Sequence, residues 1–115
     1  MTELEIPFLQ EAPFAVTVCD RDGIILAMND RAKKTFENDG GVELIGTNVL
    51  DCHPEPSRSK LAYLLETGES NKYTIEKNGV KKIIIQTPWY ESGEFAGLIE
   101  ISVEIPKEMP HFLRG

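Results

Sequence analysis

The strongest indication of the fold is the sequence Asp20-Arg21-Asp22-Gly23-Ile24-Ile25-Leu26-Ala27-Met28-Asn29. Its first four residues favour a tight turn, and they separate two short apolar runs, residues 15–19 and 24–28. Two such runs joined by a turn predict a β-hairpin. Asn29 then offers a capping side chain to the helix predicted for residues 31–36.

The middle of the chain predicts helices. Residues 42–51 carry apolar side chains around a glycine and are too interrupted for more than one or two helical turns. Residues 57–67 form the longest predicted helix, because leucines recur there at the spacing of one helical face and prolines precede them. These leucines are Leu61, Leu64 and Leu65.

The last third of the chain predicts three strands joined by hairpins. Residues 71–77 alternate, Asn78-Gly79 favours a hairpin turn, and residues 81–90 return. Residues 96–105 alternate cleanly, so one set of side chains is expected against a core and the other toward water. The set expected against the core is Ile99, Ile101, Val103 and Ile105, and the set expected toward water is Glu100, Ser102 and Glu104.

This order of elements predicts an α+β domain with an antiparallel sheet and helices packed on one face. Residues 14–106 form the predicted domain, preceded by a lead-in, residues 1–13, that permits either a short amphipathic helix or an irregular segment. Residues 107–115 are a tail. Apolar side chains in the lead-in predict a homodimer, because clustered exposed apolar groups usually mark an interface. They are Leu4, Ile6, Phe8 and Leu9.

Composition narrows the function. The chain has 115 residues, 12 basic and 19 acidic, with a net charge of -7 and no basic cluster, so nucleic-acid binding is not expected. No apolar run approaches the roughly 20 residues of a membrane span, and no signal peptide is evident, which predicts a cytoplasmic protein without membrane contact. Two cysteines in that compartment predict no disulfide.

Four motifs occur in a fixed order along the chain. The first is the Asp-x-x-Gly-x-Ile hairpin that leads to an asparagine. The others are Asn29, Ala32 and Phe36 in an Asn-x-x-Ala-x-x-x-aromatic pattern, Leu44-Ile45-Gly46, and the turn Gly93-Glu94-Phe95-Ala96-Gly97. Together they resemble the PAS family of sensor domains over residues 14–105, and the resemblance implies a five-stranded antiparallel sheet with residues 96–105 in the centre, between the first and fourth strands.

The resemblance implies a pocket between sheet and small helices, which in this family holds haem, flavin, organic acids, other metabolites or nothing. The motif of the flavin photosensors, Asn-Cys-Arg-Phe-Leu-Gln, has no counterpart in residues 48–53, so flavin is disfavoured. The ligand is otherwise unknown, because a fold does not specify its ligand. The candidate ligand-binding residues are Asn29, Phe36, Cys52, His53, Ile85 and Trp89.

The segment Asp51-Cys52-His53-Pro54-Glu55-Pro56 resembles a Cys-His-Pro element of one prokaryotic PAS subgroup. His53 or Cys52 could ligate haem iron there. Alternatively, His53 or Asp51 caps the following helix and Cys52 is a small buried group. Catalysis is not expected, because a cysteine and a histidine adjacent in sequence generally point different ways and no other catalytic set is evident.

The leading hypothesis is a sensory domain in which a bound small molecule shifts a population of states. Its output is expected to be a contact with a partner protein in trans or self-association, because no effector follows within the 115 residues; if the chain comes from a larger sensor, the effector lies elsewhere. The alternatives are a ligand-free dimerisation module and a haem-based redox or gas sensor.

Overall fold

A computed structural model describes residues 7–115, and its sheet has five antiparallel strands in the order β2-β1-β5-β4-β3. The predicted hairpins and the central place of the last strand are therefore confirmed. Leu4 and Ile6 of the lead-in lie outside the described residues. The strands are β1 (Ala15–Asp20), β2 (Ile25–Met28), β3 (Asn71–Lys77), β4 (Val80–Glu91) and β5 (Glu94–Ile105).

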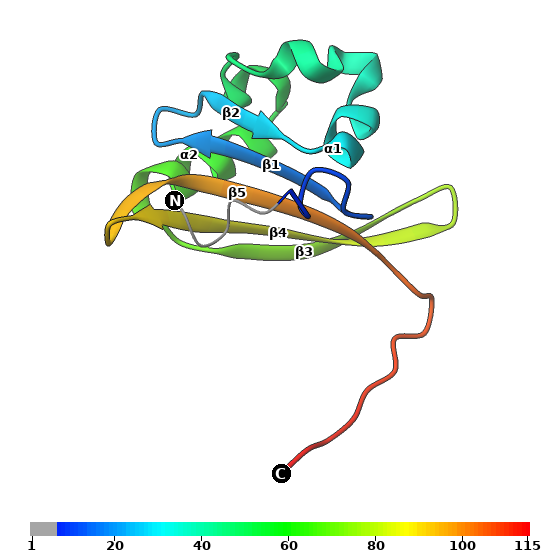
Figure 1. Ribbon diagram of the computed structural model, residues 1–115. Coiled ribbons are helices and arrows are strands. Elements are labelled where there is room, and N and C mark those ends of the chain that lie inside the picture. The colour runs from blue at the N-terminus through cyan, green and yellow to red at the C-terminus, as the bar shows by residue number, and fades with distance from the viewer. Residues whose placement is uncertain (1–6) are drawn as a thin grey trace.

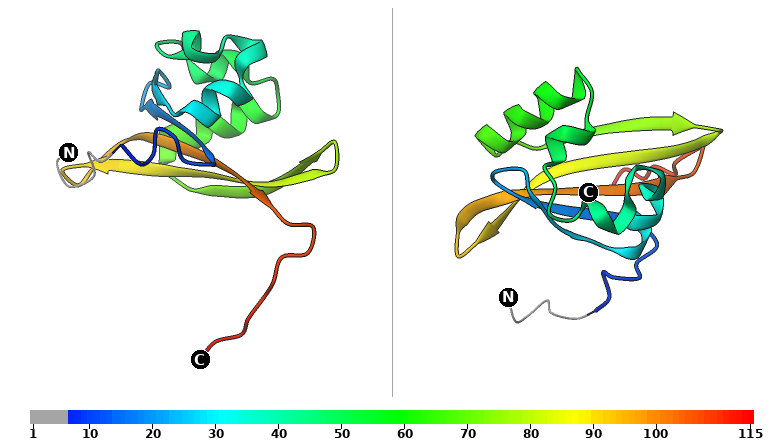
Figure 2. Two further views of the ribbon diagram at one scale, coloured as in Figure 1. Left: turned by 45° about the vertical axis from the view of Figure 1, so that its right-hand side comes forward. Right: turned by 90° about the horizontal axis from the view of Figure 1, so that it is seen from above.

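The helices all cover one face of this sheet, which we call the inner face (Figure 1). The opposite, outer face carries no helix among the described residues, and the tail after β5 leads away from it (Figure 2). The helical elements are α1 (Asp30–Thr35), η1 (Glu37–Asp39), η2 (Gly41–Leu44), η3 (Val49–Cys52) and α2 (Ser57–Thr67). None of the helices in residues 7–115 is long and apolar enough to cross a membrane.

Helix α2 packs on the inner face through the predicted leucine stripe. Leu61, Leu64 and Leu65 are all buried, and they form a cluster with Cys19 of β1 and Leu98 of β5. Gly68 ends the helix in the left-handed conformation, and its N–H donates to the carbonyl of Leu64. The helical phase read from the leucine spacing is confirmed.

Asn29 joins the first hairpin to α1 and to the lead-in. Its Oδ1 accepts hydrogen bonds from the N–H groups of Val16 at 2.9 Å and Ala32 at 3.1 Å, the second being the N-cap bond of α1. Its Nδ2 donates to the carbonyls of Leu9 at 2.9 Å and Phe14 at 2.8 Å. This buried amide therefore makes four hydrogen bonds, all to the backbone.

The faces of β5 are the reverse of those expected from the sequence. Glu100 pairs with Thr17 of β1 and Gln86 of β4 on the inner face, under the helices, whereas Ile99 and Ile101 lie on the outer face. Alternation with period two separates the faces of a strand but does not say which face is covered. The other outer-face residues of β5 are Val103 and Ile105, and the inner-face residues are Leu98, Ser102 and Glu104.

Candidate functional site

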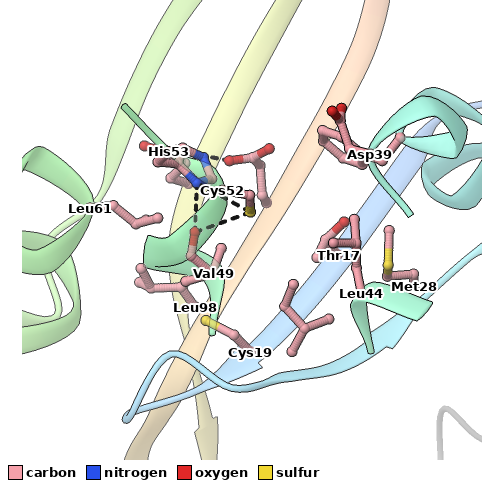
Figure 3. Close-up of a pocket in the computed structure, with 14 residues that line it drawn as sticks. Thr17, Cys19, Met28, Asp39, Leu44, Val49, Cys52, His53, Leu61 and Leu98 are labelled. Atoms are coloured by element: carbon pink, nitrogen blue, oxygen red, sulfur yellow. Dashed lines mark hydrogen bonds between the residues drawn. The ribbon is translucent and has the colours of Figure 1, made fainter. Parts of the chain in front are cut away.

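A partly enclosed cavity of about 140 Å³ lies between the inner face of the sheet and the small helices (Figure 3). Most of its wall is apolar. The first hairpin, the short helices and the central strand β5 all contribute to it. Phe36, which follows α1, and Leu61 of α2 both line the cavity. The remaining apolar lining residues are Cys19, Ile25, Met28, Leu44, Val49 and Leu98.

A chain of hydrogen bonds holds a carboxylate in this cavity. The Nδ2 of Asn71 donates to Oε1 of Gln86 at 3.0 Å, and the Nε2 of Gln86 donates to Oε2 of Glu100 at 2.9 Å. Gln86 is buried, and these two hydrogen bonds satisfy both of its amide atoms and restrict its orientation. Thr17, Asp39, Cys52 and His53 are the other polar lining residues, with Asp39 exposed at the rim.

The segment before α2 differs from the capping expectation. Neither His53 nor Asp51 caps this helix, which begins four residues after His53. Glu55 takes that role instead: its Oε1 accepts from the N–H of Ser59 at 2.8 Å and its Oε2 from the Ser59 hydroxyl at 2.7 Å. These hydrogen bonds lower the pKa of Glu55. The Nδ1 of His53 donates to the carbonyl of Val49 at 2.7 Å.

Cys52 and His53 are in contact, but the geometry does not form a nucleophile and its base. The Cys52 Sγ lies 3.8 Å from the His53 Nδ1. Because a carbonyl only accepts, the bond to Val49 places a proton on that nitrogen, which therefore cannot take the thiol proton. Partial burial, followed by the charges of Glu100, Asp39 and Asp51, raises the pKa of Cys52 and disfavours the thiolate. Cys52 is exposed overall, which corrects the expectation of a buried packing residue.

The structure brings together three of the six candidate ligand-binding residues. Phe36, Cys52 and His53 line the cavity. Ile85 and Trp89 do not line it, because their side chains lie on the outer face of β4, whereas that of Gln86 lies on the inner face. Asn29 is also absent from the lining, since its amide serves the backbone of the lead-in, β1 and α1.

Sequence reasoning missed Glu100, Gln86 and Thr17, which supply polar groups to the cavity from the three inner strands. Glu100 was assigned to water because it alternates with isoleucines. A usable signal did exist: Gln86 directly follows three isoleucines in a predicted strand, and a polar group within a buried strand requires a partner.

Comparison with known structures identifies the architecture. No family model and no curated protein matches the sequence significantly. The PAS domain of an HTR-like protein from Haloarcula marismortui superposes with a TM-score of 0.62 at 19% identity, covering 86% of this chain and 87% of that one. The chain has the PAS fold.

Two further structures with the PAS fold come from signalling proteins. The PAS domain of the histidine kinase ThkA gives a TM-score of 0.63 at 18% identity, over 78% of this chain and 97% of that one. The Aer2 receptor of Vibrio cholerae, described as a dual PAS-haem oxygen sensor, gives a TM-score of 0.60 at 18% identity, over 81% of this chain and 95% of that one. Identities this low establish the shared fold and leave the ligand open.

Haem does not fit the PAS cavity of this chain as the structure has it. A cavity of roughly 150 Å³ accommodates benzene, and a porphyrin is several times larger. The cavity here, of about 140 Å³, is close in volume to one that holds benzene. The Nδ1 of His53 is bonded to the carbonyl of Val49, and its Nε2 makes no hydrogen bond to residues 7–115. The residues present therefore match a small organic ligand better than haem.

Proposed function

We propose that this chain is a sensory domain in which a small molecule binds between the sheet and the helices and changes the association of two copies of the chain. The observation that carries the proposal is the cavity: a concave, mostly apolar site with a few convergent polar groups is the usual form of a small-ligand site. The ligand acts by differential affinity for two states, and no reaction is required. The dimer then contacts a signalling partner.

Strand β5 connects the cavity to the association surface. Leu98 and Glu100 line the cavity, while Ile99 and Ile101, which alternate with them, lie on the outer face. A ligand that moves the inner side chains therefore acts on the same backbone that carries the outer ones. The lead-in provides a second connection, because the carbonyl of Gln10 accepts from the N–H of Asp30 at the start of α1.

A second copy of this chain is the occupant that best suits the outer face. The charged side chains on that face lie at its margins, so its centre is uncharged in a protein of net charge -7, which avoids self-repulsion. Isolated apolar residues are normal on a surface, whereas a continuous apolar patch marks an interface. The patch comprises Val18, Ile83, Ile85, Ile99, Ile101, Val103 and Ile105.

We expect Ile101→Glu to convert a dimer into a monomer, because it places a charge at the centre of the apolar patch. The measurement is the mass in solution by light scattering, with circular dichroism to check folding. Ile75→Glu is the matched control: Ile75 is 43% exposed on the inner face of the edge strand β3, so this variant stays dimeric. A monomeric parent protein, or a dimeric Ile101→Glu variant, would contradict the proposal.

A further inference from the structure

We infer that the cavity binds a small amine, with an apolar body of about benzene size and an ammonium group directed at Glu100. The inference rests on the proposed function, since it takes the cavity to be a ligand site. It specifies a chemical class that excludes organic acids. Three features of the cavity support it: its charge, the hydrogen bonding of Glu100, and the size of its apolar part.

The charge of the cavity is negative. Glu100 and Asp39 line it, and no lysine or arginine does so among residues 7–115. Lys60 is in the neighbouring groove, beyond Gln86, where its ammonium lies 5.6 Å from the centre of the Tyr63 ring. An anionic ligand would thus meet two carboxylates and no cation, whereas a cationic ligand would neutralise a charge that is partly removed from water.

Glu100 is held ready for such a ligand. Its Oε2 accepts from Gln86 at 2.9 Å, and Gln86 is fixed in turn by Asn71 at 3.0 Å. Its Oε1 makes no hydrogen bond to any residue from 7 to 115, so one strong acceptor is left for a donor on the ligand. The negative charge acts on neighbours too: after the effect of burial, Glu100 raises the pKa of Tyr73 as well as that of Cys52.

The remaining wall selects an apolar body. Met28 of β2, Leu61 of α2 and Leu98 of β5 supply this wall together with Phe36, which follows α1, and the volume of about 140 Å³ is close to that of a cavity able to hold one benzene ring. Such a space excludes large cofactors and admits an aryl or branched alkyl group. A charge-assisted hydrogen bond to Glu100 would then supply orientation and specificity.

The test uses three probes with the same ring: benzylamine, benzyl alcohol and benzoate. Binding to the full chain is followed by NMR titration of backbone amides, which also locates the site through Cys19 and Leu98. We expect benzylamine to bind at least about 10-fold more tightly than benzyl alcohol, since a hydrogen bond between charged partners exceeds a neutral one by that order. Benzoate should bind more weakly than either.

Glu100→Gln should lower the affinity for benzylamine about 10-fold or more and leave that for benzyl alcohol within about 2-fold, because the glutamine keeps the acceptor for Gln86 but loses the charge. Glu104→Gln is the control, as it removes the same charge from the same face of β5 outside the cavity. Equal binding of benzylamine and benzyl alcohol to the parent protein overturns the amine class and leaves the cavity as a ligand site. Failure of all three probes to shift the cavity amides overturns both.

Discussion

Gly97→Ala is expected to destabilise the domain by at least about 3 kcal/mol. A Cβ at this position of β5 would overlap the carbonyl oxygen of Cys19 and would come within 2.8 Å of the backbone of Asp20. These atoms belong to the paired strand β1, so they cannot move without disturbing the sheet. The same carbonyl accepts a hydrogen bond at 2.9 Å from the indole of Trp89, which would be lost with it.

Equilibrium unfolding in urea, followed through the fluorescence of the single tryptophan, measures this effect. Gly93→Ala is the matched control in the same hairpin: its φ of 82° imposes left-handed strain, but nothing lies within 4 Å of its added Cβ. That variant should lose about 1 to 2 kcal/mol. If Gly97→Ala lowers the free energy of unfolding no more than Gly93→Ala does, β1 and β5 do not approach each other as closely at Gly97 as described.

Leu64→Ala is expected to cost 2 to 5 kcal/mol, about the range for deleting a buried leucine side chain. Leu64 is 0% exposed and lies at the centre of the cluster that attaches α2 to β1 and β5. Removal of three carbon atoms there leaves a void that the rigid sheet cannot close. Because α2 also forms one wall of the cavity, the change should weaken ligand binding as well.

The control for this helix is Glu66→Ala, two residues along and exposed, which should change the stability by less than about 0.5 kcal/mol. Both variants are compared by the denaturant midpoint at a common slope, so that a change in stability is separated from a change in the unfolded state. A loss below about 1 kcal/mol for Leu64→Ala would mean that α2 packs on the sheet through other residues.

Most of the fold could be predicted because its signals are local. The hairpin of residues 20–29, the Asn78-Gly79 turn and the leucine spacing of α2 each depend on a few neighbouring residues, and all are present in the structure. The capping of α2 was not predictable in the same way. Prolines delay its start, so Glu55 and not His53 meets the free N–H groups of its first turn.

The site was harder to predict because it depends on which face of the sheet is covered. Both faces of β5 carry apolar side chains, so the isoleucines gave a clear alternation without its orientation. Because the orientation was ambiguous, Ile85 and Trp89 were expected in the pocket and Glu100 and Gln86 were not, whereas the structure has the reverse. Phe36, Cys52 and His53 do line the cavity, beside which the family resemblance placed them, and their part in ligand binding stays a prediction.

The most direct test of sensing is the dissociation constant of the dimer, measured by sedimentation equilibrium with and without saturating benzylamine. Linkage requires that a ligand which shifts association also binds monomer and dimer with different affinities, and such couplings are typically about 5-fold or more. The account predicts a change of about 5-fold or more in the parent protein and a smaller change in Glu100→Gln at the same benzylamine concentration, because the variant is less fully occupied. An identical dissociation constant with the cavity empty and saturated would contradict it.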